Sequence, residues 1–67
     1  MRVRLDDIKV GDYYQMKRVA FIVVQKEQVS GLTFPLYHLY FVRHRREAGK
    51  LVPFSPSTLT MLLEHWY

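Results

Sequence analysis

The stretch of sequence that decides the fold is residues 36–54, LYHLYFVRHRREAGKLVPF. Its first part, residues 36–45, alternates with the period of two that is typical of a β-strand. One face of this strand carries Leu36, His38, Tyr40 and Val42, and the other carries Tyr37, Leu39, Phe41 and Arg43. A turn at residues 46–49 returns the chain into residues 50–54, so the stretch predicts a β-hairpin. Because proline has no backbone N–H, Pro53 confines the return strand to an edge or cuts it short.

The residues before this hairpin predict another pair of strands. Residues 13–16 and 19–25 are rich in aromatic and β-branched side chains, and Lys17-Arg18 between them marks a hairpin turn or a sharp bend. The run 19–24 is apolar at every position, which indicates a central strand that is buried on both faces. Residues 25–35 contain Ser30-Gly31 and predict either a long loop or two strand tips joined by a turn.

The N-terminus predicts a short strand and one helical turn. Residues 1–5 alternate arginine with apolar side chains, as in a strand that is half covered by the core. The paired aspartates Asp6 and Asp7 then offer caps for a single helical turn. Gly11 ends the turn, because the backbone there needs a positive φ.

The C-terminus predicts a helix over residues 56–65. Ser55 is a good capping residue, and Pro56 fits the first turn, where its missing N–H costs nothing. One stripe at three- and four-residue spacing should dock on the sheet, and it contains Leu59, Leu62, Leu63 and Trp66. Together these elements predict one domain over residues 1–67, mainly β with a C-terminal helix (α+β). Four or five antiparallel strands would form a small barrel or a curved sheet.

Composition limits the function classes. The chain has 67 residues and no cysteine, and the absence of cysteine excludes disulfides, thiolate catalysis and iron–sulfur clusters. Its formal net charge of +4 favours anionic partners. Its longest apolar run has six residues, far below the roughly 20 that a spanning helix needs. Asp6 and Asp7 lie where a signal peptide would be apolar. We therefore expect a cytoplasmic protein with no membrane segment.

Catalytic and metal-binding patterns are missing from the sequence. The three serines have explanations as turn or helix-start residues, and no Gly-x-Ser-x-Gly elbow occurs. His38 and His44 lie about 20 Å apart on an extended strand, too far to share a metal ion. We interpret His38 as a half-buried residue hydrogen-bonded to the backbone. The sequence thus predicts a protein that is not an enzyme and uses no cofactor.

A basic run in the predicted hairpin is the strongest functional signal. Four of the ten Lys and Arg residues fall within residues 43–50, where they could reach phosphates of DNA or RNA. The predicted phosphate contacts are Arg43, Arg45, Arg46 and Lys50, extended by Lys17 and Arg18. Tyr37 or Tyr40 would offer a surface on which bases stack. The alternative interpretation is a solvated hairpin tip, with Tyr37, Leu39 and Phe41 in the core.

A protein-interaction module is the second hypothesis. Four large side chains lie at positions where the sequence patterns do not require burial. If exposed, they would form a protein interface: Tyr13, Tyr14, Met61 and Tyr67. Pro53 and the short N-terminal strand also leave the edges thinly protected, so we expect a homodimer.

The segment 5–14, LDDIKVGDYY, followed by a strand with Phe21 and Val23, resembles the opening of short SH3-like barrel proteins of bacteria and phages. The resemblance covers about the first 25 residues. It implies a barrel and carries no functional residue. Such proteins include nucleic-acid binders and inhibitors of host enzymes, so both hypotheses stay open.

Overall fold

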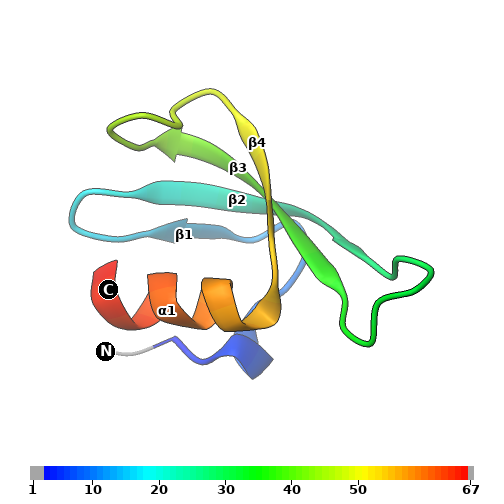
Figure 1. Cartoon of the computed structure of the whole chain (residues 1–67). Helices are drawn as coiled ribbons and strands as arrows, with labels where there is room; N and C mark the ends of the chain where they lie inside the picture. Colours follow the sequence, from blue (N-terminus) through cyan, green and yellow to red (C-terminus); the bar gives the residue numbers. More distant parts are fainter. Residues whose placement is uncertain (1–2, 67) are drawn as a thin grey trace.

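The fold is one four-stranded antiparallel sheet with a helix packed against one side of it (Figure 1). The computed structural model describes residues 3–66, with the side chains of residues 3–64. Along the chain the elements are η1 (Leu5–Asp7), β1 (Tyr13–Gln15), β2 (Ala20–Glu27), β3 (Leu36–Arg43), β4 (Leu51–Phe54) and α1 (Pro56–Trp66). The predicted α+β class and both hairpins are therefore confirmed.

The sheet is open. Its strand order is β1-β2-β3-β4, so each strand pairs with its neighbours in the sequence and, within residues 3–66, β1 and β4 do not pair. Of the two predicted forms, the structure shows the curved sheet and not a closed barrel. The edges are short: β1 has three residues, and β4 has four, including Pro53.

The core lies between the sheet and α1. Phe21 and Phe41 pair across β2 and β3, and their rings meet edge to face with centroids 5.9 Å apart. Leu59 of α1 is fully buried. The buried hydrophobic residues are Met16, Val19, Ala20, Phe21, Val23, Tyr37, Leu39, Phe41, Leu59, Leu62 and Leu63. We call the face of the sheet that carries Phe21, Leu39 and Phe41 the inner face.

The helix begins as predicted. The Oγ of Ser55 accepts a hydrogen bond from the backbone N–H of Thr58 at 3.3 Å, which caps the first turn. Leu59, Leu62 and Leu63 form the buried stripe, while Met61 is 58% exposed. The side chain of Trp66, the fourth predicted member, lies outside the described residues.

The N-terminal prediction was wrong in two respects. Residues 3–4 are not in a strand, and η1 starts at Leu5. Asp6 and Asp7 lie inside this turn and do not cap it: its N-cap position is Arg4, which makes no side-chain capping bond. Gly11 has a φ of 93°, as its expected role as a turn ending requires.

The central strand β2 is fully buried on its inner face but only partly on its outer face, where Ala20 is buried and Ile22 is half-buried. Val23 on the inner face is inaccessible, whereas Val24 is 47% exposed. Val24 lies at an irregularity in the ladder, where the register shifts between Val23 and Gln25. The expectation that both faces of this strand are covered therefore fails at Val24, because the helix α1 packs on the inner face.

Candidate nucleic-acid interface

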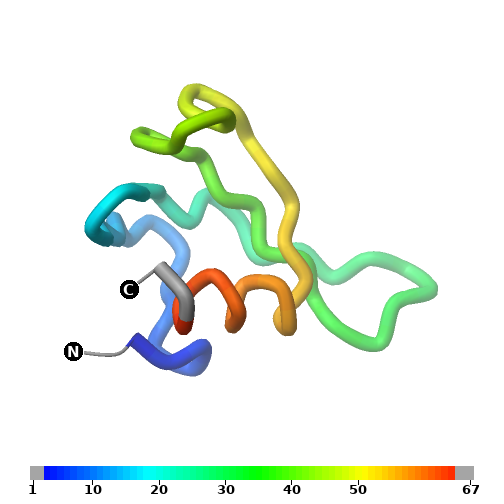
Figure 2. Tube along the Cα trace, turned by 60° about the vertical axis from the view of Figure 1, so that its left-hand side comes forward, coloured from blue at the N-terminus to red at the C-terminus, as the bar shows by residue number. Residues whose placement is uncertain are grey.

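Antiparallel pairing brings two basic turns to the same end of the sheet. Ala20 at the start of β2 lies opposite Arg43 at the end of β3, so the β1–β2 turn and the β3–β4 connection are neighbours. Figure 2 shows both turns at one end of the molecule, with the loop 28–35 projecting from the other end. The backbone N–H of Met16 donates to the carbonyl oxygen of Val19 at 2.7 Å and closes the first turn.

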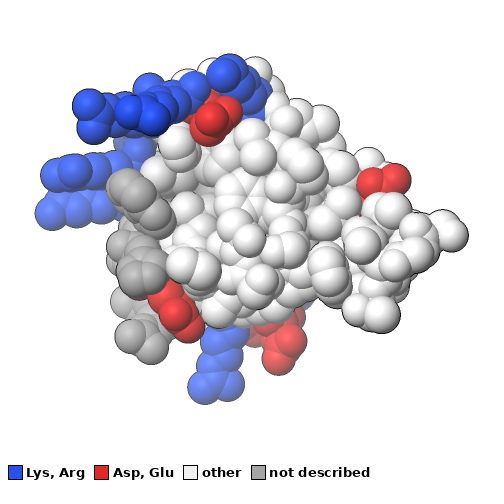
Figure 3. All heavy atoms as spheres, in the orientation of Figure 1, with Lys and Arg blue, Asp and Glu red and all other residues white. Residues whose placement is uncertain are grey.

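Side chains link these two turns directly. Nη2 of Arg43 donates a hydrogen bond to the main-chain oxygen of Met16 at 2.8 Å. A small pocket of about 100 Å³ lies between the turns, and Arg18, Val19, His44 and Arg45 line it. We call the six cations of the two turns the basic end: Lys17, Arg18, Arg43, Arg45, Arg46 and Lys50. Figure 3 shows Lys and Arg gathered at this end, whereas the opposite end is largely uncharged on the visible face.

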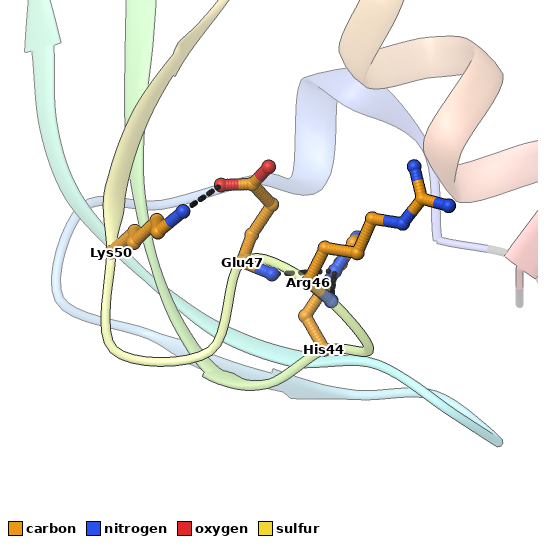
Figure 4. Close-up of polar contacts among 4 residues, drawn as sticks. All are labelled: His44, Arg46, Glu47 and Lys50. Carbon is orange, nitrogen blue, oxygen red and sulfur yellow. Dashed lines mark hydrogen bonds and ion pairs between the residues drawn. The ribbon is translucent and has the colours of Figure 1, made fainter.

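His44 holds the β3–β4 connection in shape. Its Nδ1 accepts hydrogen bonds from the backbone N–H groups of Arg46 at 3.1 Å and Glu47 at 3.0 Å (Figure 4). Its ring packs edge to face on Phe41, with centroids 4.8 Å apart. Nδ1 accepts both bonds through its lone pair, so one side chain satisfies two backbone donors of the connection. Sequence reasoning missed this role, for which a histidine immediately before a polar turn is the only sequence signal.

The cations of the basic end differ in what they contact. Arg43 is tied to Met16, and Nζ of Lys50 lies 3.8 Å from Oε2 of Glu47. Within the part of the chain that the structure describes, the side chains of the other four make no ion pair or hydrogen bond: Lys17, Arg18, Arg45 and Arg46. These four are exposed and available to an anion.

Of the two tyrosines predicted to stack on bases, Tyr37 is buried and Tyr40 is exposed. Tyr37 is 6% exposed and lies in the core, so its ring cannot stack on a base, and Leu39 and Phe41 beside it are buried too. The alternative interpretation of these three side chains as core is the one the structure shows. Tyr40 is 40% exposed and lies on the outer face of β3.

The residues of the alternative protein interface do not form one surface. Tyr13 is 51% exposed on the sheet, but Met61 is exposed on α1, which packs on the inner face. Tyr14 turns toward the core, where its ring lies 5.6 Å from that of Phe21. Its hydroxyl accepts a hydrogen bond from the Lys9 N–H at 3.1 Å and lies 3.2 Å from the Asp7 carbonyl oxygen, to which it donates. Tyr67 lies outside the described residues.

The other chemistry-bearing residues are dispersed. Nε2 of His38 lies 2.9 Å from Oε1 of Glu27, so its partner is a carboxylate and not the backbone as predicted. Among residues 3–64, whose side chains are described, no three His, Cys, Asp or Glu lie close enough together to hold a metal ion. None of the helices described is long and apolar enough to cross a membrane.

Comparison with known proteins adds no relative. No protein-family model matches the chain, and no curated protein or solved structure matches it either. The resemblance of the first 25 residues to SH3-like barrel proteins therefore stays a prediction.

Proposed function

We propose that this protein is a non-enzymatic nucleic-acid-binding module that contacts phosphates through the basic end. The observation that supports this function best is the juxtaposition of two cationic turns. They are joined by the hydrogen bond between Arg43 and Met16, which are 27 residues apart in sequence. Long cationic side chains that project from neighbouring turns can follow a phosphate backbone.

The six cations of the basic end fall into two groups, those that have an intramolecular partner and those that have none in the described structure. Lys17, Arg18, Arg45 and Arg46 make the phosphate contacts, because nothing in the described structure engages them. Arg43 holds the two turns together, and Lys50 shares its charge with Glu47. Because neither turn of the basic end contains Phe, Tyr or Trp, binding there depends on phosphates and shows little preference for base sequence.

A salt titration tests this function. Binding of fluorescein-labelled single-stranded DNA, duplex DNA and RNA would be measured between about 50 and about 200 mM salt. If about four phosphates of duplex DNA are neutralised, log affinity falls with log salt with a slope near −3.6. Absence of binding to all three nucleic acids at the lowest salt would overturn the proposal.

A matched pair of variants separates the basic end from overall charge. The triple variant Arg18→Gln, Arg45→Gln and Arg46→Gln lowers the formal net charge of +4 by three. The control variant Arg4→Gln, Lys9→Gln and Lys26→Gln lowers it equally, from exposed positions outside the basic end. We expect the first variant to flatten the salt slope by about three units and the control to leave most of it. Equal loss in both variants would show that no particular surface binds.

A further inference from the structure

An apolar row crosses the whole outer face of the sheet. Tyr13, Ile22, Tyr40 and Leu51 are consecutive register partners on β1, β2, β3 and β4. Three of them are highly exposed, with values of 51% for Tyr13, 40% for Tyr40 and 55% for Leu51. Cross-strand partners project from the same face, so these four side chains form a continuous stripe.

Two further apolar side chains extend this row. Val24 and Val42 are the extra residues at the two irregularities of the β2–β3 ladder, and they are 47% and 49% exposed. We call the six residues the outer apolar face: Tyr13, Ile22, Val24, Tyr40, Val42 and Leu51. A half-exposed sheet normally alternates apolar inside with polar outside, and this one is apolar on both faces along its centre.

The outer apolar face suits a second copy of itself. A two-fold interface brings the same patch together twice, so any net charge in the patch would repel itself. The row contains no charged residue, and Glu27 at the far end of β2 is paired with His38. Like charges of the basic ends favour the arrangement in which they lie at opposite ends of the dimer.

The surface area is consistent with a weak dimer. The strands contain 3, 8, 8 and 4 residues, so at about 3.3 Å per residue and about 4.8 Å between strands the sheet plane covers roughly 360 Å². Two such faces, enlarged by their projecting side chains, bury on the order of 1,000 Å², the lower limit of specific interfaces. The chain also exposes 4982 Å², whereas a monomer of 8.1 kDa exposes roughly 4,500 Å².

We propose that the outer apolar face docks on the same face of a second copy, forming a two-fold dimer of sheets packed about 10 Å apart. This surface differs from the strand edges, from which the sequence predicts dimerisation. The proposal does not depend on nucleic-acid binding, because the basic end and the outer apolar face share no residue.

Sedimentation equilibrium over a range of protein concentration tests the dimer. We expect the parent to move from 8.1 kDa toward twice that mass, with a dissociation constant on the order of 10–100 µM. Leu51→Lys places a charge in the row and should keep the protein monomeric throughout. Met61→Lys, at an equally exposed position on α1, should dimerise like the parent.

A second variant and a salt series complete the test. Tyr13→Lys introduces the charge at the other end of the row, and circular dichroism with a urea midpoint establishes that each variant folds. High salt should leave dimerisation unchanged or strengthen it, whereas it weakens nucleic-acid binding. A parent that stays monomeric at about 500 µM, well above that range, overturns the proposal. Dimerisation of both lysine variants as strongly as the parent would overturn it too.

Discussion

Nη2 of Arg43 donates a hydrogen bond to the main-chain oxygen of Met16 at 2.8 Å and so ties the end of β3 to the β1–β2 turn. Arg43 belongs to the basic run, yet its guanidinium makes an intramolecular hydrogen bond. The basic end therefore owes its shape to one of its own cations. Removal of this arginine should affect stability, whereas removal of Arg45 or Arg46 should affect only binding.

Arg43→Ala should lower the free energy of unfolding by about 1–2 kcal/mol, because the mutation removes a hydrogen bond from a charged donor. Arg45→Ala should change it by less than about 0.5 kcal/mol, since its side chain is exposed. Urea denaturation of both variants measures the difference. Equal stability of the two variants would show that the bond to Met16 contributes nothing.

His44→Ala should loosen the β3–β4 connection, because the backbone N–H groups of Arg46 and Glu47 lose their acceptor. We expect a loss of about 1 kcal/mol and faster hydrogen exchange at both amides. His44→Asn is the matched control, because its Oδ1 can accept the same two bonds. If the asparagine variant exchanges as fast as the alanine variant, the acceptor at this position is not what orders the connection.

The sequence predicted the elements that local patterns encode. The period of two predicted a strand over residues 36–45, of which residues 36–43 form β3, and Ser55 and Pro56 predicted the start of α1. The strand expected for residues 1–5 failed because a short alternating pattern needs a partner strand, and the structure provides none for residues 3–4. Closure of the sheet is also a tertiary property, since it depends on whether the two edges meet.

The candidate site was predicted in part. The cations of the basic end could be read from the sequence, but their different contacts could not, because Arg43 meets Met16 only after β2 and β3 pair. Strand alternation correctly put Tyr37 with Leu39 and Phe41, yet it cannot say which face a helix covers. The choice between stacking surface and core was therefore undecidable before α1 was placed.

Tyr14 should make the free energy of unfolding depend on pH in the alkaline range. Burial raises the pKa of its phenol above 10.0; the hydrogen bond from the Lys9 backbone opposes this, and the negative charge of Asp12 adds to it. The folded state thus favours the protonated phenol, so its contribution to stability is complete below the unfolded pKa and is lost as pH rises through the folded one. Urea denaturation from about pH 8 to about pH 11 should show Tyr14→Phe losing stability less steeply than the parent.

A matched control for this prediction is Tyr13→Phe. The Tyr13 side chain is 51% exposed, and its hydroxyl makes no hydrogen bond within the described residues. We expect this variant to keep the parent's pH dependence. A parent slope that survives in Tyr14→Phe would assign the alkaline loss of stability to other groups.

Glu47→Gln should strengthen nucleic-acid binding. Oε2 of Glu47 lies 3.8 Å from Nζ of Lys50 (Figure 4). Glu47 is the one acidic residue within the basic run of residues 43–50. Its removal takes away a charge that repels phosphate and frees Lys50 for a further contact. A surface pair of this kind is worth up to about 1 kcal/mol, so affinity at low salt should rise about two- to fivefold. The salt slope should steepen by up to about one unit.

Glu27→Gln removes the same charge from the far end of β2. Seven residue steps along that strand place Glu27 about 23 Å from Ala20, which exceeds the Debye length of about 10 Å in 0.1 M salt. Its replacement should therefore leave nucleic-acid affinity close to that of the parent. An equal gain in both variants would mean that net charge alone sets the affinity, and a loss in Glu47→Gln would mean that Lys50 needs its partner to be positioned for phosphate.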